Sequence, residues 1–149
     1  MLKGIDPLLN ADVLQVLCAM GHGDDLILCD TNFPAESVAR KSGLGRLLRI
    51  DRPAPEVARA VLSVYPLDSF ADDAAARMQV GDTPDEIPPV HTEAQAVIDA
   101  AEGKSWPLIP IERFAFYDRA RAAYAIIQTQ ETRFFGNFAL LKVVIPPAA

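Results

Sequence analysis

Apolar residues recur along the chain at two different spacings, and each spacing predicts a different kind of element. In residues 10–20 they follow the period of a helix, with Asn10 as the N-cap and Gly21 directly after the last turn. Residues 26–30, Leu-Ile-Leu-Cys-Asp, instead form an apolar run without alternation. Such a run is typical of a strand that is covered on both faces, as in a parallel sheet.

The rest of the chain repeats these two patterns in alternation. Helical spacing covers residues 55–65, 91–102 and 114–123, and a short helical turn is expected near 35–41. Apolar runs of strand length occupy residues 47–50, 76–80, 124–129 and 138–145. Strands that alternate with helices predict an α/β fold. We expect a single-domain three-layer sandwich over residues 1–149, with a mostly parallel central sheet between helical layers.

Composition and charge narrow the class of protein. Half of the 149 residues are apolar, which excludes a disordered tail protein, and the length fits one domain. The formal net charge is -6, with 20 Asp and Glu against 14 Lys and Arg. Binding by phosphate neutralisation needs a basic face, so neither nucleic acid nor an anionic membrane is an expected partner.

The chain also lacks the segments that direct a protein into or across a membrane. No apolar stretch approaches the ~20 residues of a membrane span, and the first residues, with Asp6 and Pro7, lack the apolar core of a secretory signal. Cys18 and Cys29 lie in apolar segments without a CxxC spacing, so we expect both to be buried, unreactive thiols. The expected location is the cytoplasm.

The densest polar cluster is Gly21-His22-Gly23-Asp24-Asp25, between the first helix and the first strand. The glycines on either side of His22 allow a sharp turn and leave the imidazole accessible. Imidazole, with an unperturbed pKa of ~6.5, is the side chain best matched to proton transfer near neutral pH. The residues alone leave two interpretations open: a catalytic histidine, or a turn histidine beside solvated acids.

Three further places are candidates for ligand binding. Asp30 ends the buried strand, at the edge where open α/β sheets bind ligands; it either accepts hydrogen bonds from ligand hydroxyls or caps the turn that follows. Arg113 and Tyr117 are four residues apart and therefore share one face of the predicted helix. They either bind a ligand together or have structural roles, Arg113 as a surface cation and Tyr117 as a ring in the core. Residues 134–138 place a glycine and an amide between aromatic rings, as a binding segment or as a hairpin-like turn.

The remaining polar and aromatic residues give no sign of cofactor or metal chemistry. His91 precedes a helix without a second metal ligand at useful spacing, so a cap or surface role is expected. We expect Trp106 in the core rather than as a sugar-stacking platform. Two histidines and no Cys pair predict no metal site. The chain has no GxGxxG, GxxxxGK[ST] or GxSxG motif, and no cofactor is expected.

Five sequence blocks together resemble the L-fucose mutarotase family, which belongs with the D-ribose pyranase group. They keep the family's order and spacing over essentially the whole chain: Met1-Leu2-Lys3-Gly4-Ile5 with Pro7-Leu8-Leu9, Met20-Gly21-His22-Gly23-Asp24, Asp30 with Asn32-Phe33-Pro34-Ala35, Arg113-Phe114-Ala115-Phe116-Tyr117-Asp118-Arg119-Ala120, and Phe135-Gly136-Asn137. GHGD alone is a weak signal, but GHGD, RFAFY and GN at these separations form a specific one.

The resemblance implies a cofactor-independent enzyme that interconverts sugar anomers, assembled as a ring-shaped decamer with sugar sites where subunits meet. It implies that His22 is the acid/base histidine. From the chemistry of proton transfer we expect a carboxylate, Asp24 or Asp30, to orient this ring. Tyr117 is then a second group for proton transfer or hydroxyl binding. The positions that match the family's sugar-binding residues are Asp30, Arg113, Phe135, Gly136 and Asn137.

Two positions depart from the family's pattern. Phe135 stands where the family usually has tyrosine, and Asn32 where a histidine often precedes Phe-Pro-Ala. Phe135 lacks the hydroxyl that the family's tyrosine would supply, and the hydroxyl of Tyr117 is the candidate to replace it. Because of this difference, two functions other than that of an L-fucose mutarotase stay open. One is a monosaccharide-binding protein without catalysis, in sugar uptake or sensing. The other is a pyranase that interconverts the pyranose and furanose forms of ribose.

Overall fold

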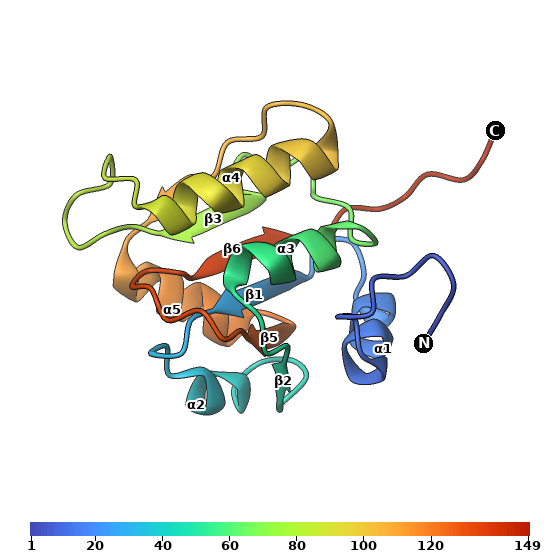
Figure 1. The fold of residues 1–149 in the computed structure, drawn as a ribbon, viewed down its shortest axis with the longest axis horizontal. Helices are drawn as coiled ribbons and strands as arrows, with labels where there is room; N and C mark the ends of the chain where they lie inside the picture. Colours follow the sequence, from blue (N-terminus) through green and yellow to red (C-terminus); the bar gives the residue numbers. More distant parts are fainter.

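The computed structural model describes residues 1–149, in which helices and strands alternate along most of the chain (Figure 1). The helices are α1 (Ala11–Ala19), α2 (Ala35–Ala39), α3 (Ala54–Leu62), α4 (Pro89–Glu102) and α5 (Arg113–Ala122). The strands are β1 (Asp25–Cys29), β2 (Leu47–Arg49), β3 (Ala75–Met78), β4 (Ile109–Ile111), β5 (Ala125–Gln128) and β6 (Phe138–Leu141). Each predicted helix and strand is present, although β6 ends at Leu141 rather than at residue 145.

The strands form one six-stranded sheet in the order β2-β5-β1-β6-β3-β4. The pairs β2–β5, β5–β1 and β3–β4 are parallel, whereas β6 is antiparallel to both of its neighbours. The prediction of a mostly parallel sheet is therefore confirmed. Because β1 lies between β5 and β6, residues 134–138 are not the turn of a hairpin, and that alternative is wrong.

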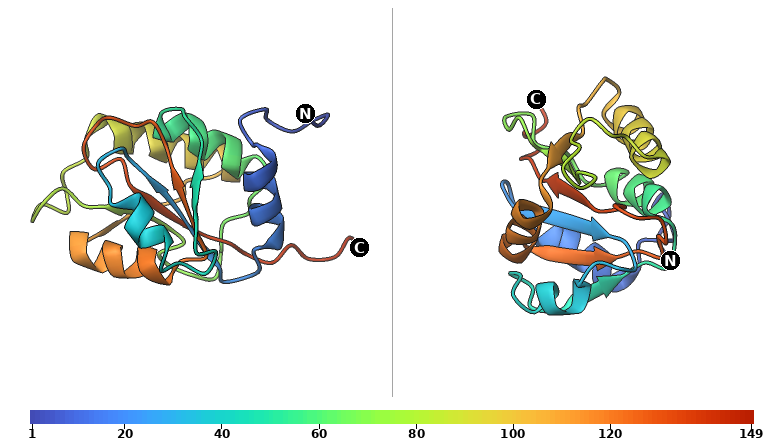
Figure 2. Two further views of the ribbon diagram at one scale, coloured as in Figure 1. Left: turned by 90° about the horizontal axis from the view of Figure 1, so that it is seen from below. Right: turned by 90° about the vertical axis from the view of Figure 1, so that its left-hand side faces the viewer.

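Strand β1 explains why its sequence is apolar without alternation. Leu26 and Leu28 belong to the larger core, which includes buried residues of α1, α3 and α4. Ile27 and Cys29, whose side chains point to the opposite face, belong to the smaller core beneath α2 and α5. Figure 2 shows the sheet edge-on between these two helical layers. The three-layer α/β sandwich predicted from the sequence is confirmed.

The unpredicted strand β4 lies at the outer edge of the sheet, paired only with β3. It has three residues, and the central one is Pro110, which has no N–H to donate to a second neighbour. A strand this short and half-buried gives no clear hydropathy pattern, which is why the sequence did not reveal it.

Side-chain caps fix where the helices begin. Asn10 accepts a hydrogen bond from the backbone N of Val13 at 3.0 Å, so its predicted role as the N-cap of α1 is confirmed. Glu112 accepts from the backbone N of Phe114 at 2.9 Å and of Ala115 at 3.1 Å. This second cap fixes the first turn of α5, on which two of the candidate binding residues lie.

Two sequence predictions about single residues have different outcomes. Cys29 is buried as expected, but Cys18 is exposed, because α1 covers the core with only one face, through Val13, Val16 and Leu17. Trp106 is half-buried and packs against the larger core.

None of the helices combines the length and hydropathy needed to cross a bilayer.

Candidate functional site

Asp30 and Asn137 form a buried pair at the adjoining ends of the two central strands, β1 and β6. Asp30 directly follows β1 and Asn137 directly precedes β6, and these two strands are antiparallel neighbours. The backbone N of Asp30 donates to Asn137 Oδ1 at 2.9 Å, and Asn137 Nδ2 donates to Asp30 Oδ2 at 3.1 Å. The strand order therefore joins two residues that lie 107 positions apart in the chain.

The second carboxylate oxygen of Asp30 organises the turn that follows β1. Asp30 Oδ1 accepts from the backbone N of Asn32 at 3.0 Å and of Phe33 at 2.9 Å. Burial raises the pKa of this carboxyl above its usual value, although the hydrogen bonds it accepts oppose the rise. Asp30 thus has the capping role that the sequence left open, and it also lies against a cavity.

Arg113 and Tyr117 reach the same region from the first two turns of α5. Arg113 Nε donates to the Tyr117 hydroxyl at 3.1 Å, and the guanidinium lies 5.4 Å from the centre of the Tyr117 ring. The prediction that both residues share a helix face is confirmed. Tyr117 also packs against the Phe33 ring, with a centroid distance of 5.4 Å. The Tyr117 side chain is consequently held by Arg113 at its hydroxyl and by Phe33 at its ring.

These groups surround an open cavity of about 290 Å³. It lies beside the carboxyl end of β1, where α/β sheets commonly bind ligands. Its wall combines a carboxylate, two amides, a guanidinium and a phenol with aromatic rings and a thioether. The lining residues are Asp30, Asn32, Phe33, Met78, Arg113, Tyr117, Phe134, Phe135 and Asn137.

The segment before β6 has an unusual backbone that depends on close packing. Phe135 adopts a left-handed conformation with φ 62°, the only residue other than glycine that does so. A Cβ atom on Gly136 would lie 2.6 Å from Glu131 Cγ, so only glycine fits there. Both features bring the backbone of this segment close to Asp30 and turn the Phe135 ring into the cavity wall.

The structure places His22 far from this cavity. His22 lies in the turn before β1, whereas Asp30 follows β1, and the five residues between the two ends span roughly 16 Å. The exposed His22 ring accepts a hydrogen bond at Nδ1 from the backbone N of Val144 at 3.2 Å. Its ring centroid lies 6.2 Å from that of Phe70. One chain therefore does not bring together all the predicted site residues.

Neither candidate carboxylate orients His22 within one chain. Asp30 is at the opposite end of β1, and Asp24 Oδ2 accepts from the backbone N of Gly21 at 2.7 Å, which closes the turn instead. Asp24 therefore supports the backbone around His22 without contacting its ring. No group of three or more His, Cys, Asp or Glu side chains is arranged to hold a metal ion.

The sequence prediction for His91 is wrong. His91 is 1% exposed in the first turns of α4, and its Nε2 lies 2.7 Å from the carbonyl oxygen of Phe135. Met78 in the cavity wall was also missed, together with Glu131 and Arg133, which support the loop before β6. Their separation from the motifs in sequence left no local pattern to reveal them.

One consequence concerns the Tyr117 hydroxyl. We expect Tyr117→Phe to raise the dissociation constant of a ligand bound in the cavity about fivefold, because the ring and its packing stay while the hydroxyl contact with Arg113 and the ligand is lost. Titration followed by NMR measures this. Tyr124→Phe is the control, because Tyr124 lies outside the cavity wall. An unchanged dissociation constant for Tyr117→Phe would contradict a binding role for the hydroxyl.

The cavity's size and chemistry define a class of protein. Ligand pockets typically begin near about 300 Å³, so this cavity suits one small molecule. Hydrogen-bonding side chains beside aromatic rings match a ligand that has many hydroxyls and an apolar ring face. The fold and the site thus define a small α/β protein with a site of the monosaccharide-binding kind.

Comparison with known proteins gives the family. Residues 3–145 match the model of the RbsD / FucU transport protein family, and the chain belongs to this family. The resemblance to the L-fucose mutarotases found in the sequence blocks is thereby confirmed. A fucose mutarotase from Danio rerio is 39% identical over 151 residues, which cover 98% of this chain and 95% of that protein.

Solved structures agree with this assignment. The crystal structure of protein Atu2016, for which a sugar-binding role has been suggested, is 56% identical, with a TM-score of 0.96 over 98% of this chain and 97% of that one. A fucose mutarotase from Streptococcus pneumoniae, solved in complex with L-fucose, is 34% identical, with a TM-score of 0.86. This similarity covers 97% of the present chain and 100% of the streptococcal one.

Proposed function

We propose that this chain is a cofactor-independent mutarotase that interconverts the α and β anomers of L-fucose or a similar monosaccharide. The observation that carries the proposal is the convergence of Asp30, Arg113 and Asn137 on one cavity. They come from three separate segments of the chain, and the family resemblance implied a sugar-binding role for each. Relatives of this chain that are named fucose mutarotases span nearly its whole length.

The reaction needs only proton transfer at two oxygens. A base takes the proton of the anomeric hydroxyl while an acid protonates the ring oxygen, and the bond between the anomeric carbon and the ring oxygen breaks. Rotation about the adjacent carbon–carbon bond exposes the other face of the aldehyde, and the reverse transfers close the ring. No electrons leave the sugar, so positioned acid and base groups are sufficient for catalysis.

The cavity residues bind the sugar in this proposal. Asp30 accepts from a sugar hydroxyl, Arg113 donates to one, and Asn137 fixes the Asp30 carboxylate through its amide. The Phe135 ring packs against the sugar's apolar face, and Gly136 allows the backbone to approach. Tyr117 serves as a second hydroxyl-binding or proton-transfer group.

His22 is the main acid/base group in this proposal. Its Nδ1 accepts a hydrogen bond from a backbone N–H, so the neutral ring carries its proton on Nε2. Nε2 is therefore the atom that exchanges a proton with the sugar. Because His22 and the cavity lie at opposite ends of β1, the His22 that acts on a bound sugar comes from a neighbouring subunit.

Exposed apolar side chains support this shared site. Phe70 and Val144 are 79% and 52% exposed, and both contact His22. Phe114 and Phe134 are 66% and 74% exposed beside the cavity. Apolar surface of this kind marks an interface. We propose that residues 1–149 form one domain of a ring-shaped decamer in the cytoplasm, with each site completed across a subunit boundary.

Saturation-transfer NMR with L-fucose and D-ribose tests the function directly. A mutarotase exchanges magnetisation between the anomers of fucose faster than the uncatalysed reaction does. Exchange between the pyranose and furanose forms of ribose alone would identify a pyranase instead. Binding of either sugar without exchange would identify a passive sugar-binding protein. Either of the last two outcomes contradicts the proposal.

The phenylalanine at position 135 makes a separate prediction. We expect Phe135→Tyr to lower the KM for L-fucose about threefold, because the added hydroxyl reaches a cavity that already holds hydrogen-bonding partners. The exchange assay measures the change, and Phe114→Tyr is the control, because the Phe114 ring is 66% exposed and lies outside the cavity wall. A KM that rises in Phe135→Tyr would show that the cavity excludes the hydroxyl.

A further inference from the structure

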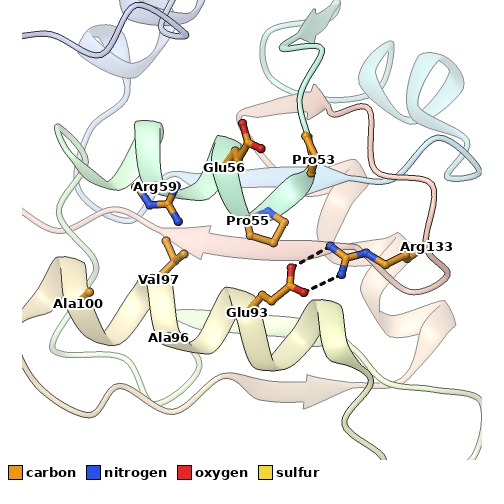
Figure 3. Close-up of a pocket in the computed structure, with 9 residues that line it drawn as sticks. All are labelled: Pro53, Pro55, Glu56, Arg59, Glu93, Ala96, Val97, Ala100 and Arg133. Carbon is orange, nitrogen blue, oxygen red and sulfur yellow. Dashed lines mark hydrogen bonds and ion pairs between the residues drawn. The ribbon is translucent and has the colours of Figure 1, made fainter.

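Helix α4 contacts the sugar-binding segment through two side chains of its first turns. His91 Nε2 lies 2.7 Å from the carbonyl oxygen of Phe135. Two residues later, Glu93 pairs with Arg133 through two contacts of 2.9 and 3.0 Å. Figure 3 shows this second pair at one end of the groove between α3 and α4. The loop before β6 is therefore held to α4 at two points.

The chemistry of the neighbours fixes the state of the His91 ring. A carbonyl oxygen only accepts hydrogen bonds, so Nε2 must carry a proton and donate it to Phe135. On the other side, Arg77 Nη1 lies 3.4 Å from His91 Nδ1, and a guanidinium only donates. Burial lowers the pKa of His91 to about 4, which keeps the ring neutral near pH 7.

Arg77 is itself fixed by the loop between β3 and α4. It is 5% exposed, and it donates to the carbonyl oxygens of Glu86 at 3.3 Å and Pro84 at 2.6 Å. The ring of His91 also packs edge-on against Phe138, the first residue of β6, with centroids 5.6 Å apart. Both nitrogens of His91 and its ring thus have fixed partners, so the orientation of the side chain is well determined.

The position that His91 contacts is the one whose backbone is strained. A left-handed φ is unfavourable for a residue with a Cβ atom and persists only where surrounding contacts enforce it. Gly136 and Asn137, which follow Phe135, lie against Asp30. A rotation of the Phe135 peptide would therefore move both the Phe135 ring and the Asn137 amide relative to the cavity.

We propose that His91 is a positioning residue for the sugar site: its Nε2–H holds the Phe135 carbonyl, and so keeps the Phe135 ring and the Asn137 amide in their binding orientation. This inference rests on the proposed mutarotase function. His91 is not in the cavity wall, so it acts through the Phe135 backbone and touches no reacting atom.

Two substitutions at position 91 separate the hydrogen bond from packing. His91→Phe keeps an aromatic ring against Phe138 but removes both nitrogens, whereas the side-chain amide of His91→Gln reaches as far as Nε2 and still donates. We expect His91→Phe to raise the KM for L-fucose about tenfold, with kcat within about threefold of wild type, because a binding orientation is lost and the proton-transfer groups are untouched. His91→Gln should keep KM within about threefold.

Ile98→Ala is the matched control for loss of stability. Ile98 is 1% exposed on α4, two turns beyond His91, and its truncation destabilises the same helix without removing a contact to the loop. We expect a lower melting temperature but a wild-type KM. The proposal is overturned if His91→Phe keeps the wild-type KM, or if Ile98→Ala raises KM as much as His91→Phe does.

Nitrogen NMR tests the hydrogen bond without any assay of activity. The chain has only two histidines, so protein labelled with ¹⁵N-histidine gives signals from His22 and His91 alone, and His91→Gln identifies the second set. Correlations from ring nitrogens to carbon-bound protons distinguish the two neutral tautomers. At pH 7 we expect the Nε2–H form for His91, and the Nδ1–H form would overturn the proposal.

A failure of the proposed function would be distinguishable from a failure of this inference. If the wild-type protein bound L-fucose without exchanging its anomers, the mutarotase assignment would fail. The effect of His91→Phe on the dissociation constant for L-fucose, from NMR titration, would still show the expected tenfold weakening. If the wild-type protein exchanged anomers normally and His91→Phe bound fucose as wild type does, only the positioning role would fail.

Discussion

His22→Gln is expected to slow the exchange of L-fucose anomers by roughly 10²–10⁴-fold, the usual contribution of a positioned acid/base group. Gln keeps the size and polarity of the side chain but does not accept and return a proton at Nε2. The cavity of the same chain is intact in this variant, because His22 lies at the other end of β1. L-fucose binding by NMR titration should therefore change by less than about threefold.

A mixture of two inactive variants tests whether each site is shared between subunits. Arg113→Ala removes a cavity residue and leaves His22, while His22→Gln does the reverse. When both are co-expressed in equal amounts, chance places an intact His22 opposite an intact cavity in about one quarter of the interfaces. Exchange should then recover to about a quarter of the wild-type rate.

The alternative makes a different prediction for that mixture. If each site belonged to one chain, every subunit would carry one defect, and co-expression would give no more activity than the two variants measured separately. The rate of the mixture thus decides between the two arrangements. Analytical ultracentrifugation of the same sample confirms that both variants still assemble.

Glu131→Ala is expected to have the largest effect on stability, a loss of about 3 kcal/mol in the free energy of unfolding. The carboxylate is 3% exposed, and it accepts from the backbone N of Ala54 at 3.2 Å. It also accepts three hydrogen bonds from Arg133, through the backbone N at 3.0 Å, Nε at 2.8 Å and Nη2 at 3.0 Å. Its removal leaves the backbone N–H of Ala54 and the backbone N–H and Nε–H of Arg133 without this acceptor, and the guanidinium keeps only its pair with Glu93.

Urea unfolding, followed by circular dichroism, measures this loss. The control is Glu36→Ala, which breaks an exposed contact of 3.9 Å with Arg40 and should change the free energy of unfolding by less than about 0.5 kcal/mol. Equal midpoints for the two variants would contradict the role of Glu131. The sugar affinity should fall in Glu131→Ala as well, because Gly136 packs directly against the Glu131 side chain.

The contribution of Glu131 also has a characteristic pH dependence. Burial alone would raise its pKa, but hydrogen bonds from Arg133 and Ala54 outweigh this and lower the pKa below its reference value of 4.5. The carboxyl therefore stabilises the fold fully above the unfolded-state pKa, and this stabilisation is lost as the pH falls through the lowered folded-state pKa. As the pH falls below about 4.5, wild type should therefore lose more stability than Glu131→Ala.

The fold could be predicted from the sequence where the hydropathy pattern of an element matches the number of its faces that other elements cover. The unbroken apolar run of β1 predicts a strand covered on both faces, and β1 has helices on both sides. The short edge strand β4 was missed because half-buried residues around a proline give no such contrast. Cys18 was placed wrongly because α1 covers one end of the core rather than a sheet face, and its far side is exposed.

The site was predictable residue by residue but not as an arrangement. Family blocks identified Asp30, Arg113 and Asn137, and the spacing of Arg113 and Tyr117 predicted their contact. The pairing of Asp30 with Asn137 follows from the strand order, which places β6 beside β1 rather than beside β5. The sequence predicts only a cap or surface role for His91, because its partners, Arg77 and Phe135, are distant in the chain and approach it only in the folded structure.

The position of β6 in the sheet has a consequence for biosynthesis. It lies between β1 and β3, so it joins a group formed by β2, β5 and β1 to a pair formed by β3 and β4. Until residues 138–141 have left the ribosome, these two groups have no strand to connect them, and the edges of β1 and β3 are unpaired. Nascent chains that stall before this point would expose edges prone to aggregation, which chaperones would have to protect.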